Sequence, residues 1–162
     1  MYVIKVMSGD EEKVKNLLTQ KGYKILCPKK IKIHRRKDSY YEKEMVIFTG
    51  YLFLELETVT DRQYYQIKTI DGVIGFLSAR YALYKQEQSY IRVLDNNGEP
   101  IREVVLYFDK YGFAHLTRGF IDGFDKQIVS VNRKDKTVAI EFKIENDVKK
   151  IVLNYTECLG RI

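Results

Sequence analysis

Residues 48–77 constrain the fold more than any other part of the chain. Within them, residues 51–56 are rich in aromatic and aliphatic side chains and alternate as a strand does that is buried on at least one face. Residues 62–70 then place tyrosines and isoleucines near helical spacing, and Asp71-Gly72 ends that helix. The apolar run at residues 73–77 follows. The stretch therefore predicts a strand, a helix and a second strand.

The neighbouring residues extend this pattern to a whole domain. Residues 2–6 read as a strand, and Ser8 is expected to cap a helix that runs from Glu11 to Leu18. Strand-like residues and a hairpin that turns at residues 38–39 follow, and helical spacing returns at residues 83–94. The order β-α-β-β-β-α-β predicts an α+β domain, in which an antiparallel sheet carries helices on one face.

A second domain is expected after a linker. Residues 95–107 combine a turn cluster, Pro100 and a local excess of acids, which is typical of a linker. Beyond them the chain has five short β-like runs, at residues 113–116, 128–132, 138–143, 149–153 and 158–162. Such runs predict a small all-β, SH3-like barrel. The expected domains are thus residues 1–94 and 108–162.

Composition narrows the class of protein. With 162 residues, 45% hydrophobic and 31% charged, the chain should be globular and not disordered. No apolar run approaches the roughly 20 residues of a membrane span, and no signal-peptide pattern opens the chain, so a cytoplasmic protein is expected. Cys27 and Cys158 have neither CxxC spacing nor a nearby histidine, so no metal or cofactor is expected.

Catalytic motifs are missing from the sequence. His34 and His115 have no serine, cysteine or carboxylate partner at a motif spacing, and no phosphate-binding glycine motif occurs. An enzyme is therefore not expected. The chain instead has 13 tyrosines and eight phenylalanines, many of them in residues 48–77, which favours a binding protein.

Three motifs in the first domain resemble a known family. Residues 8–14 match the pattern SGxEExV, residues 49–56 match PGYLFxEL except for Thr49 in place of proline, and residues 72–77 match GVxGFL. Found in this order, they resemble the N-terminal domain of the NusG family of transcription elongation factors. The resemblance implies a domain that docks on RNA polymerase.

A fourth motif lies in the second domain. Residues 119–129 are similar to the KOW motif, GPFxGFxGxVV, with matches at Gly119, Gly123, Phe124 and Val129. Phe120 replaces the usual proline, and Lys126 replaces the hallmark glycine. These departures point to specialised NusG paralogs, of which LoaP-like antiterminators are the most similar pattern and RfaH-like proteins form another branch.

The resemblance also implies candidate polymerase-binding residues. In the NusG family the corresponding strand and helix form a hydrophobic depression that holds the clamp helices of RNA polymerase. Carried over by position, the candidates are Tyr2, Phe48, Tyr51, Phe53, Arg62 and Phe76. For any single aromatic residue among them, a place in the core is the alternative.

Two basic clusters are candidate RNA sites. Residues 24–37 hold seven lysines and arginines and no acid, and such a block attracts phosphate in a salt-dependent way. Its candidate residues are His34, Arg35, Arg36 and Lys37. The second cluster comprises Arg118, Lys126, Arg133, Lys134, Lys136 and Lys149. Charge alone favours the first cluster, whereas the resemblance to LoaP-like proteins favours the second; a solvated turn is the alternative for both.

These observations together predict a monomeric transcription regulator. Its first domain would bind RNA polymerase, its KOW-like domain would bind a structured RNA hairpin, and the protein would act as a processive antiterminator. One alternative is a general elongation or termination factor whose KOW domain contacts Rho or the ribosome, and another is a ribosome-associated RNA-binding protein. RfaH-like refolding to helices is disfavoured by the β-branched runs at residues 128–131 and 138–140.

Overall fold

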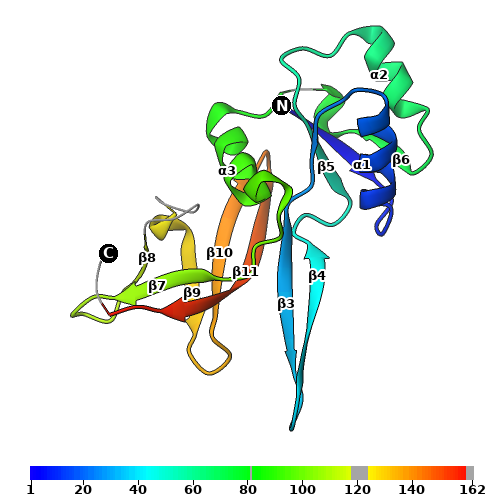
Figure 1. The fold of residues 1–162 in the computed structure, drawn as a ribbon. Helices are drawn as coiled ribbons and strands as arrows, with labels where there is room; N and C mark the ends of the chain where they lie inside the picture. The colour runs from blue at the N-terminus through cyan, green and yellow to red at the C-terminus, as the bar shows by residue number, and fades with distance from the viewer. Residues whose placement is uncertain (81, 118–123, 160–162) are drawn as a thin grey trace. The chain divides into compact units, whose positions relative to one another are not determined.

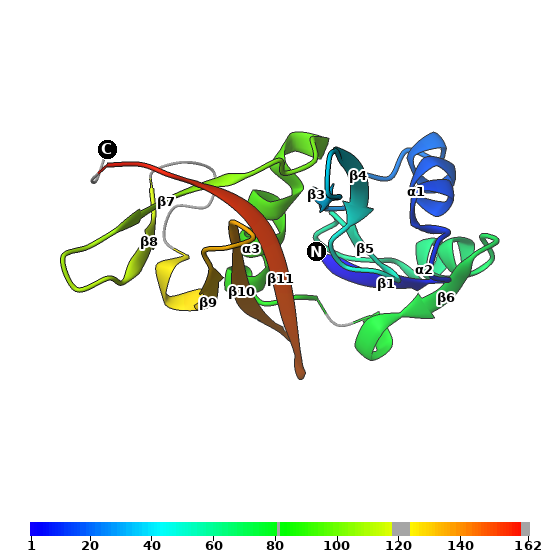
Figure 2. The same cartoon turned by 90° about the horizontal axis from the view of Figure 1, so that it is seen from below.

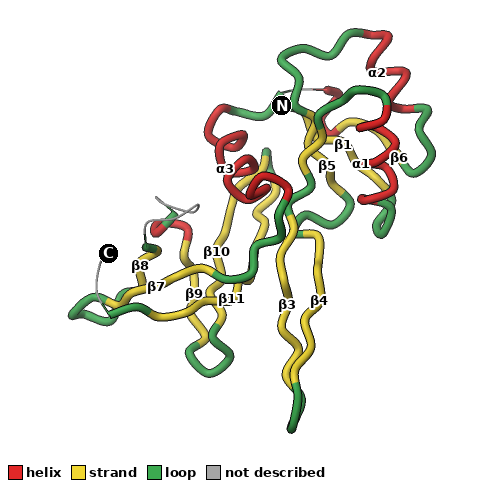
Figure 3. The backbone as a smooth tube through the Cα atoms, in the orientation of Figure 1, coloured by secondary structure: helices red, strands yellow, loops and turns green. Residues whose placement is uncertain are grey.

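The computed structural model describes residues 1–80, 82–117 and 124–159, which fold as two compact units. The first unit combines Met1–Pro28 with Val46–Gly98, and the second combines Lys29–Met45 with Glu99–Ile162. The first contains the α-helices and an antiparallel sheet, whereas the second is built mainly from strands (Figures 1 and 3). The fold is therefore α+β, which confirms the predicted class.

The first unit contains a four-stranded sheet of order β2-β5-β1-β6, antiparallel throughout. Its elements are β1 (Tyr2–Val6), α1 (Glu11–Gln20), β2 (Ile25–Leu26), β5 (Tyr51–Leu54), α2 (Asp61–Lys68), β6 (Val73–Phe76), η1 (Leu77–Arg80), α3 (Lys85–Asp95) and η2 (Asn96–Gly98). The helices η1 and η2 are short 3-10 turns.

The core of the first unit lies between this sheet and helices α1 and α2. Ile4 of β1 and Leu52 and Leu54 of β5 pack there against Val14 of α1 and Ile67 of α2. All five are fully buried, and each such aliphatic side chain contributes about 1.5–3 kcal/mol to stability. Alternation along the strands directs the intervening residues to the opposite face.

A buried carboxylate joins helix α1 to strand β5. Glu11 is only 4% exposed, and its two oxygens accept hydrogen bonds from the backbone amides of Gly9 (2.9 Å) and Gly50 (2.7 Å). Asp10, at the N-cap, makes no capping bond with its side chain. The expectation that Ser8 caps this helix was therefore wrong, because Glu11 itself satisfies the nearby amides.

Helix α2 begins with a complete capping box. The hydroxyl of Thr60 accepts from the backbone amide of Gln63, and the side chain of Gln63 accepts from the backbone amide of Thr60. This reciprocal arrangement satisfies amides that would otherwise be left without partners at a helix start. Asp61 lies in the first turn, where its negative charge is favourable next to the helix dipole.

The second unit contains a five-stranded sheet of order β8-β7-β11-β10-β9 and a separate hairpin, β3-β4. Its elements are β3 (Lys29–Arg35), β4 (Tyr40–Val46), β7 (Val104–Phe108), β8 (Ala114–Leu116), η3 (Asp125–Gln127), β9 (Ile128–Asn132), β10 (Thr137–Ile144) and β11 (Asp147–Glu157). The β3-β4 hairpin turns at residues 38–39, as predicted.

Strand β11 is long and curved, and it joins the two halves of the five-stranded sheet (Figure 2). Asp147–Asn154 pair antiparallel with β10, and Tyr155–Glu157 pair parallel with β7. The sheet curls in a way that fits the predicted SH3-like, KOW-like barrel. Ile140 and Leu153, 0% and 2% exposed, lie in the core of this unit.

Two boundaries of the second unit differ from the prediction. Strand β7 begins at Val104, within residues 95–107 that the sequence assigned to a linker. The strand expected at residues 158–162 is not seen at Cys158, which follows the end of β11, and residues 160–162 lie outside the described residues. The fifth strand is therefore β7, whose partner β11 is about 50 residues further along the chain. No local pattern reveals such a partner.

Hydrogen bonds tie the β3-β4 hairpin into the second unit. Ile101 and strand β3 exchange two backbone hydrogen bonds of 2.8 Å, with Lys29 as acceptor and Ile31 as donor. The side-chain amide of Asn154 donates to the carbonyl oxygens of Ile31 (2.7 Å) and Arg102 (2.9 Å). The hairpin thus packs with the segment before β7 and with β11.

Gly72 provides a test of the first unit. Its φ of +93° favours glycine, and an added Cβ would lie 2.8 Å from Cγ2 of the fully buried Val14. We expect Gly72→Ala to lower the free energy of unfolding by about 2–4 kcal/mol, because it combines backbone strain with overpacking. Urea denaturation of the full chain measures this change.

Gly22→Ala is the matched control for that test. Gly22 has a similar φ of +89°, but no atom lies within 4 Å of its added Cβ. Gly22→Ala should lower the free energy of unfolding only by the backbone strain, about 1–2 kcal/mol. Equal destabilisation by the two substitutions would show that the contact with Val14 has no effect.

Candidate functional site

The predicted polymerase-binding residues lie on both faces of the first unit's sheet. Tyr2 and Phe76 are on the face covered by α1 and α2, with their rings edge to face at 6.4 Å. Tyr51 and Phe53 point to the other face, since they alternate with the core residues of β5. Phe48 packs edge to face on Phe53 at 5.3 Å. These residues therefore do not form one continuous surface.

Burial divides the same residues further. Tyr2, Phe48 and Phe53 are 8%, 2% and 0% exposed and lie in the interior. Tyr51 and Phe76 are half-buried, and Arg62 is exposed on α2. The positions with accessible surface are therefore Tyr51, Phe76 and Arg62.

A strip of the sheet beside Tyr51 is open. Lys5 of β1 pairs with Tyr51 on one side and with Gly75 on the other, so these three residues form a row across the sheet. No atom lies within 4 Å of a Cβ built on Gly75, and the adjacent Ile74 is 60% exposed. We call Lys5, Tyr51 and Gly75 the open strip. Ile74 is the residue of β6 that the register skips between Val73 and Gly75, and the sequence did not single it out.

The first basic cluster lies at the tip of the β3-β4 hairpin. The ring of His34 stacks on Tyr41 with centroids 4.6 Å apart, and the guanidinium group of Arg36 lies 5.3 Å from the centre of the Tyr41 ring. Arg35, Arg36 and Lys37 are exposed. The structure thus brings the four predicted residues of this cluster together.

Acids of strand β4 neutralise part of the positive charge near this cluster. Glu44 forms an ion pair of 3.2 Å with Lys29, and Glu42 pairs with Arg102 through both guanidinium nitrogens. The ammonium group of Lys30 donates to the carbonyl oxygen of Val152 (2.6 Å), and burial lowers its pKa. The hairpin is consequently less basic as a surface than its sequence suggested, except at the tip.

The second basic cluster is centred on the turn between β9 and β10. Arg133, Lys134 and Lys136 lie in this turn, and Asn132 shapes it by accepting from the backbone amide of Asp135 (3.0 Å). Lys134 is exposed, whereas the ammonium group of Lys136 lies 3.3 Å from the carboxylate of Glu157.

The other predicted members of this cluster lie elsewhere. Lys149 is opposite Phe142, five positions along β10 from Thr137, which corresponds to roughly 17 Å. Lys126 is in η3, at the far end of β9 from Arg133. Arg118 and the KOW-like residues 119–123 lie outside the described residues. The structure therefore separates the predicted second cluster into a turn and two distant lysines.

A charged network around His115 was missed by sequence reasoning. Nε2 of His115 lies 3.0 Å from the carboxylate of Asp109, Nδ1 lies 3.4 Å from that of Asp125, and the ring stacks on Tyr107 at 4.8 Å. Asp109 also accepts from the backbone amide of Phe113. These partners are six residues before and ten residues after the histidine, and no short motif has that spacing.

This network holds together the β7-β8 hairpin and η3. Asp125 accepts from the backbone amide of Leu116 (2.7 Å), so it joins η3 to β8. The hydrogen bond that the protonated ring of His115 donates to the carboxylate of Asp109 raises the pKa of His115, and the same contact lowers the pKa of Asp109. In the described part of the chain, no group of three or more His, Cys, Asp or Glu residues could hold a metal ion. Because its hydrogen bonds join η3 to the β7-β8 hairpin, we assign the network a structural role.

Comparison with known proteins identifies the family. Residues 1–101 match the family described as transcription termination factor nusG. The chain belongs to the NusG family. The description of this family as a transcription termination factor confirms the expectation of a NusG-family transcription protein. No helix in the described ranges is both long and apolar enough to cross a membrane.

Two relatives extend the match beyond the first unit. The chain is 24% identical over 170 residues to the transcription termination/antitermination protein NusG of Rickettsia bellii (strain RML369-C), covering 96% of this chain and 87% of that protein. Among solved structures, one on domain interaction in Thermotoga maritima NusG aligns with a TM-score of 0.51 and 21% identity. That alignment covers 94% of this chain and 92% of the other, and it shows a shared fold.

His115 gives a pH-dependent prediction. Its pKa is raised above the ordinary 6.5, so its stabilising contribution is complete below pH 6.5 and is lost as the pH rises through the raised value. We expect the second unit to lose stability from mildly acidic to alkaline pH, and His115→Gln to remove most of this fall. Urea unfolding followed by the NMR signals of Leu116 and Ile128 at several pH values measures it.

The control for this experiment is His34→Gln, which replaces the chain's other histidine and leaves the two aspartate contacts of His115 intact. The pH-dependent fall should persist in this variant. A fall of the same size in His115→Gln would contradict the assignment to His115.

Proposed function

We propose that the protein is a processive antiterminator that docks on RNA polymerase with its first unit and binds a structured RNA hairpin with its second. The observation that carries this proposal is the combination of a NusG-type N-terminal region, residues 1–101, with a curled sheet that presents a basic turn. The protein would suppress pausing and termination by holding the elongating polymerase in its productive conformation.

The open strip supports the polymerase half of the proposal. Tyr51 and the side-chain-free surface at Gly75 lie in one row with Lys5 between them, and a helix can lie on such an open row, as in helix-in-groove recognition. Within the proposal, Tyr51 contacts the polymerase clamp from the open strip, whereas Phe76 and Arg62, on the side of the sheet that carries the helices, would make a second, separate contact with the polymerase. The buried Tyr2, Phe48 and Phe53 act as positioning residues that fix the sheet.

The β9-β10 turn supports the RNA half. Arg133, Lys134 and Lys136 lie within four consecutive residues whose only acid is Asp135, and a compact basic turn can follow the phosphates of a hairpin. Lys126 and Lys149 would add more distant phosphate contacts. The tip of the β3-β4 hairpin is the competing site, because Arg35, Arg36 and Lys37 are exposed there.

The two contacts reinforce each other within one chain. Each can be weak alone, because binding of one unit makes the second contact intramolecular and raises its effective concentration. An RNA hairpin near the start of a transcript would then recruit the protein to the polymerase that made it. This gives selectivity for a transcript without reading any DNA sequence.

Transcription by purified RNA polymerase tests the proposal. The template carries tandem intrinsic terminators behind the native leader, and a second template lacks the leader. We expect the full chain to raise the fraction of transcripts that pass both terminators on the first template and to have little effect on the second.

The same assay separates the rival functions. An equal effect with and without the leader would indicate a general NusG-type factor, whose KOW domain would contact Rho or the ribosome. No effect on either template, together with RNA binding, would indicate a ribosome-associated RNA-binding protein. Either result would contradict the proposed antitermination.

Salt dependence tests the turn as an RNA site. Loss of one phosphate contact lowers the slope of log K against log salt by about 0.9. We expect Lys134→Gln to weaken hairpin binding and to reduce the slope by about this amount, as measured by fluorescence anisotropy at several salt concentrations.

Two further variants complete this salt experiment. Lys143→Gln removes an exposed lysine of the same unit, on strand β10, and should leave the slope unchanged. Arg36→Gln removes a charge at the tip of the β3-β4 hairpin. A change in slope with Arg36→Gln and none with Lys134→Gln would move the RNA site to the tip.

A further inference from the structure

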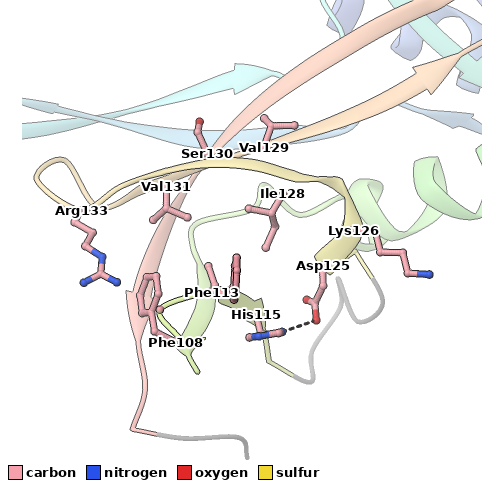
Figure 4. Close-up of a pocket in the computed structure, with 12 residues that line it drawn as sticks. Phe108, Phe113, His115, Asp125, Lys126, Ile128, Val129, Ser130, Val131 and Arg133 are labelled. Atoms are coloured by element: carbon pink, nitrogen blue, oxygen red, sulfur yellow. Dashed lines mark hydrogen bonds and ion pairs between the residues drawn. The ribbon is translucent and has the colours of Figure 1, made fainter. Parts of the chain in front are cut away.

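A pocket lies along the seam between the two edge strands of the curled sheet. Strands β8 and β9 are at opposite ends of the strand order β8-β7-β11-β10-β9. Residues from the β7-β8 hairpin, η3 and β9 together line a cavity of about 540 Å³ (Figure 4). This volume is within the range of roughly 300–1,000 Å³ that is usual for small-ligand sites.

The walls of the seam pocket are apolar and aromatic. Ile128 and Val131 of β9 point into it, whereas Val129 and Ser130 between them point away (Figure 4). The irregular register of β9 against β10, next to Ala139, accounts for this break in alternation. Phe108 and Phe113, from the β7-β8 hairpin, line the opposite side.

Cations lie at both ends of the pocket. Arg133 is at one end, with its guanidinium carbon 4.1 Å from the centre of the Phe108 ring, and Lys126 is at the other end (Figure 4). The acid that lines the pocket, Asp125, is already engaged by His115 and by the backbone amide of Leu116. The pocket therefore combines aromatic surface with positive charge on both sides.

Phe113 provides the exposed aromatic ring of the pocket. Its side chain is 66% exposed although it lines the pocket, and a large exposed aromatic ring contributes little to the core. An aromatic ring beside basic groups is the arrangement with which proteins bind unpaired nucleotides: the base stacks on the ring, and the cations bind its phosphates.

We propose that the seam pocket binds one unpaired nucleotide of the RNA, with its base stacked on Phe113 and a flanking phosphate held by Arg133, while Lys126, at the other end of β9, is available to a phosphate further along the strand. The inference rests on the proposed RNA recognition by the second unit, and it specifies which feature of the hairpin is read. An unpaired base can leave the helix at little cost, whereas a paired base must first be unstacked.

The charge distribution favours a nucleotide over a peptide. An extended peptide could add to the free edge of β8 or β9, but it would bind through backbone hydrogen bonds and would need no cation at either end. Arg133 beside the aromatic surface, with Lys126 further along the seam, instead matches a polyanionic ligand that carries a flat ring.

Two RNA hairpins that differ by one nucleotide test this inference with the full chain. One has a fully paired stem, and the other has the same stem with a single bulged 2-aminopurine. We expect the bulged RNA to bind about tenfold more tightly, and the fluorescence of its 2-aminopurine to be quenched on stacking. Phe113→Ala should remove both the preference and the quenching.

Tyr111→Ala is the matched control. Tyr111 is in the same β7-β8 turn and is 75% exposed, but it does not line the pocket. This variant should keep the preference for the bulged RNA. Thermal unfolding of both variants, in which an exposed ring is removed, should match that of the unaltered chain.

The outcomes separate the inference from the proposed function. Equal binding of the two RNAs, or equal effects of Phe113→Ala and Tyr111→Ala on the preference, would overturn the nucleotide site while leaving hairpin binding in place. Binding of neither RNA would overturn both. Protection of the β9 amides from exchange by a short extended Thr-Val peptide, without any preference for the bulge, would assign the seam to an added strand and also overturn the proposal.

Discussion

The first unit depends on the burial of strand β5 on both of its faces. Leu52, Phe53 and Leu54 are consecutive residues, and all three are 0% exposed. Since successive side chains of a strand point to opposite faces, this is possible only if both faces of the sheet are covered at that point. Tyr51, one position earlier, is half-buried and begins the open strip. On the face that Tyr51 and Phe53 share, the boundary between candidate docking surface and core therefore falls between these two residues.

Most of the secondary structure of the first unit could be predicted from the sequence, but the faces of its side chains could not. The strands and helices were predictable because their apolar residues recur with the correct periods, as in residues 51–56 and 62–70. The face that each aromatic residue occupies was not predictable, because it depends on pairing. Phe76 lies opposite Ile4 and thus faces the helices, and an irregularity in β1 between Lys5 and Val6 sets that register. A single residue of slip would have exchanged the two faces.

In the second unit, prediction from the sequence was limited by contacts between residues that are far apart in the chain. Strands β9 and β10 are joined by a short turn and were predicted, whereas β7 was assigned to a linker because its partner is the far end of β11. The His115 network has the same cause, since the curled sheet and the β7-β8 turn bring Asp109 and Asp125 to one ring. Charge counting likewise misjudged the β3-β4 hairpin, because Glu44 of the facing strand pairs with Lys29 and the ammonium group of Lys30 is held by the carbonyl oxygen of Val152.

The contacts that stabilise the curled five-stranded sheet also shape the pocket proposed to bind an unpaired nucleotide. Asp125 fixes η3 to β8 through Leu116, and η3 leads directly into β9, so the network helps to set the separation of the two edge strands. At the other end of the seam, the guanidinium group of Arg133 lies over the ring of Phe108 and connects the β9-β10 turn to β7. A pocket fixed at both ends can receive a flat ring without reorganising, which reduces the entropic cost of binding. Strands β8 and β9 are not paired with each other, so the seam between them is available for the proposed binding of a nucleotide.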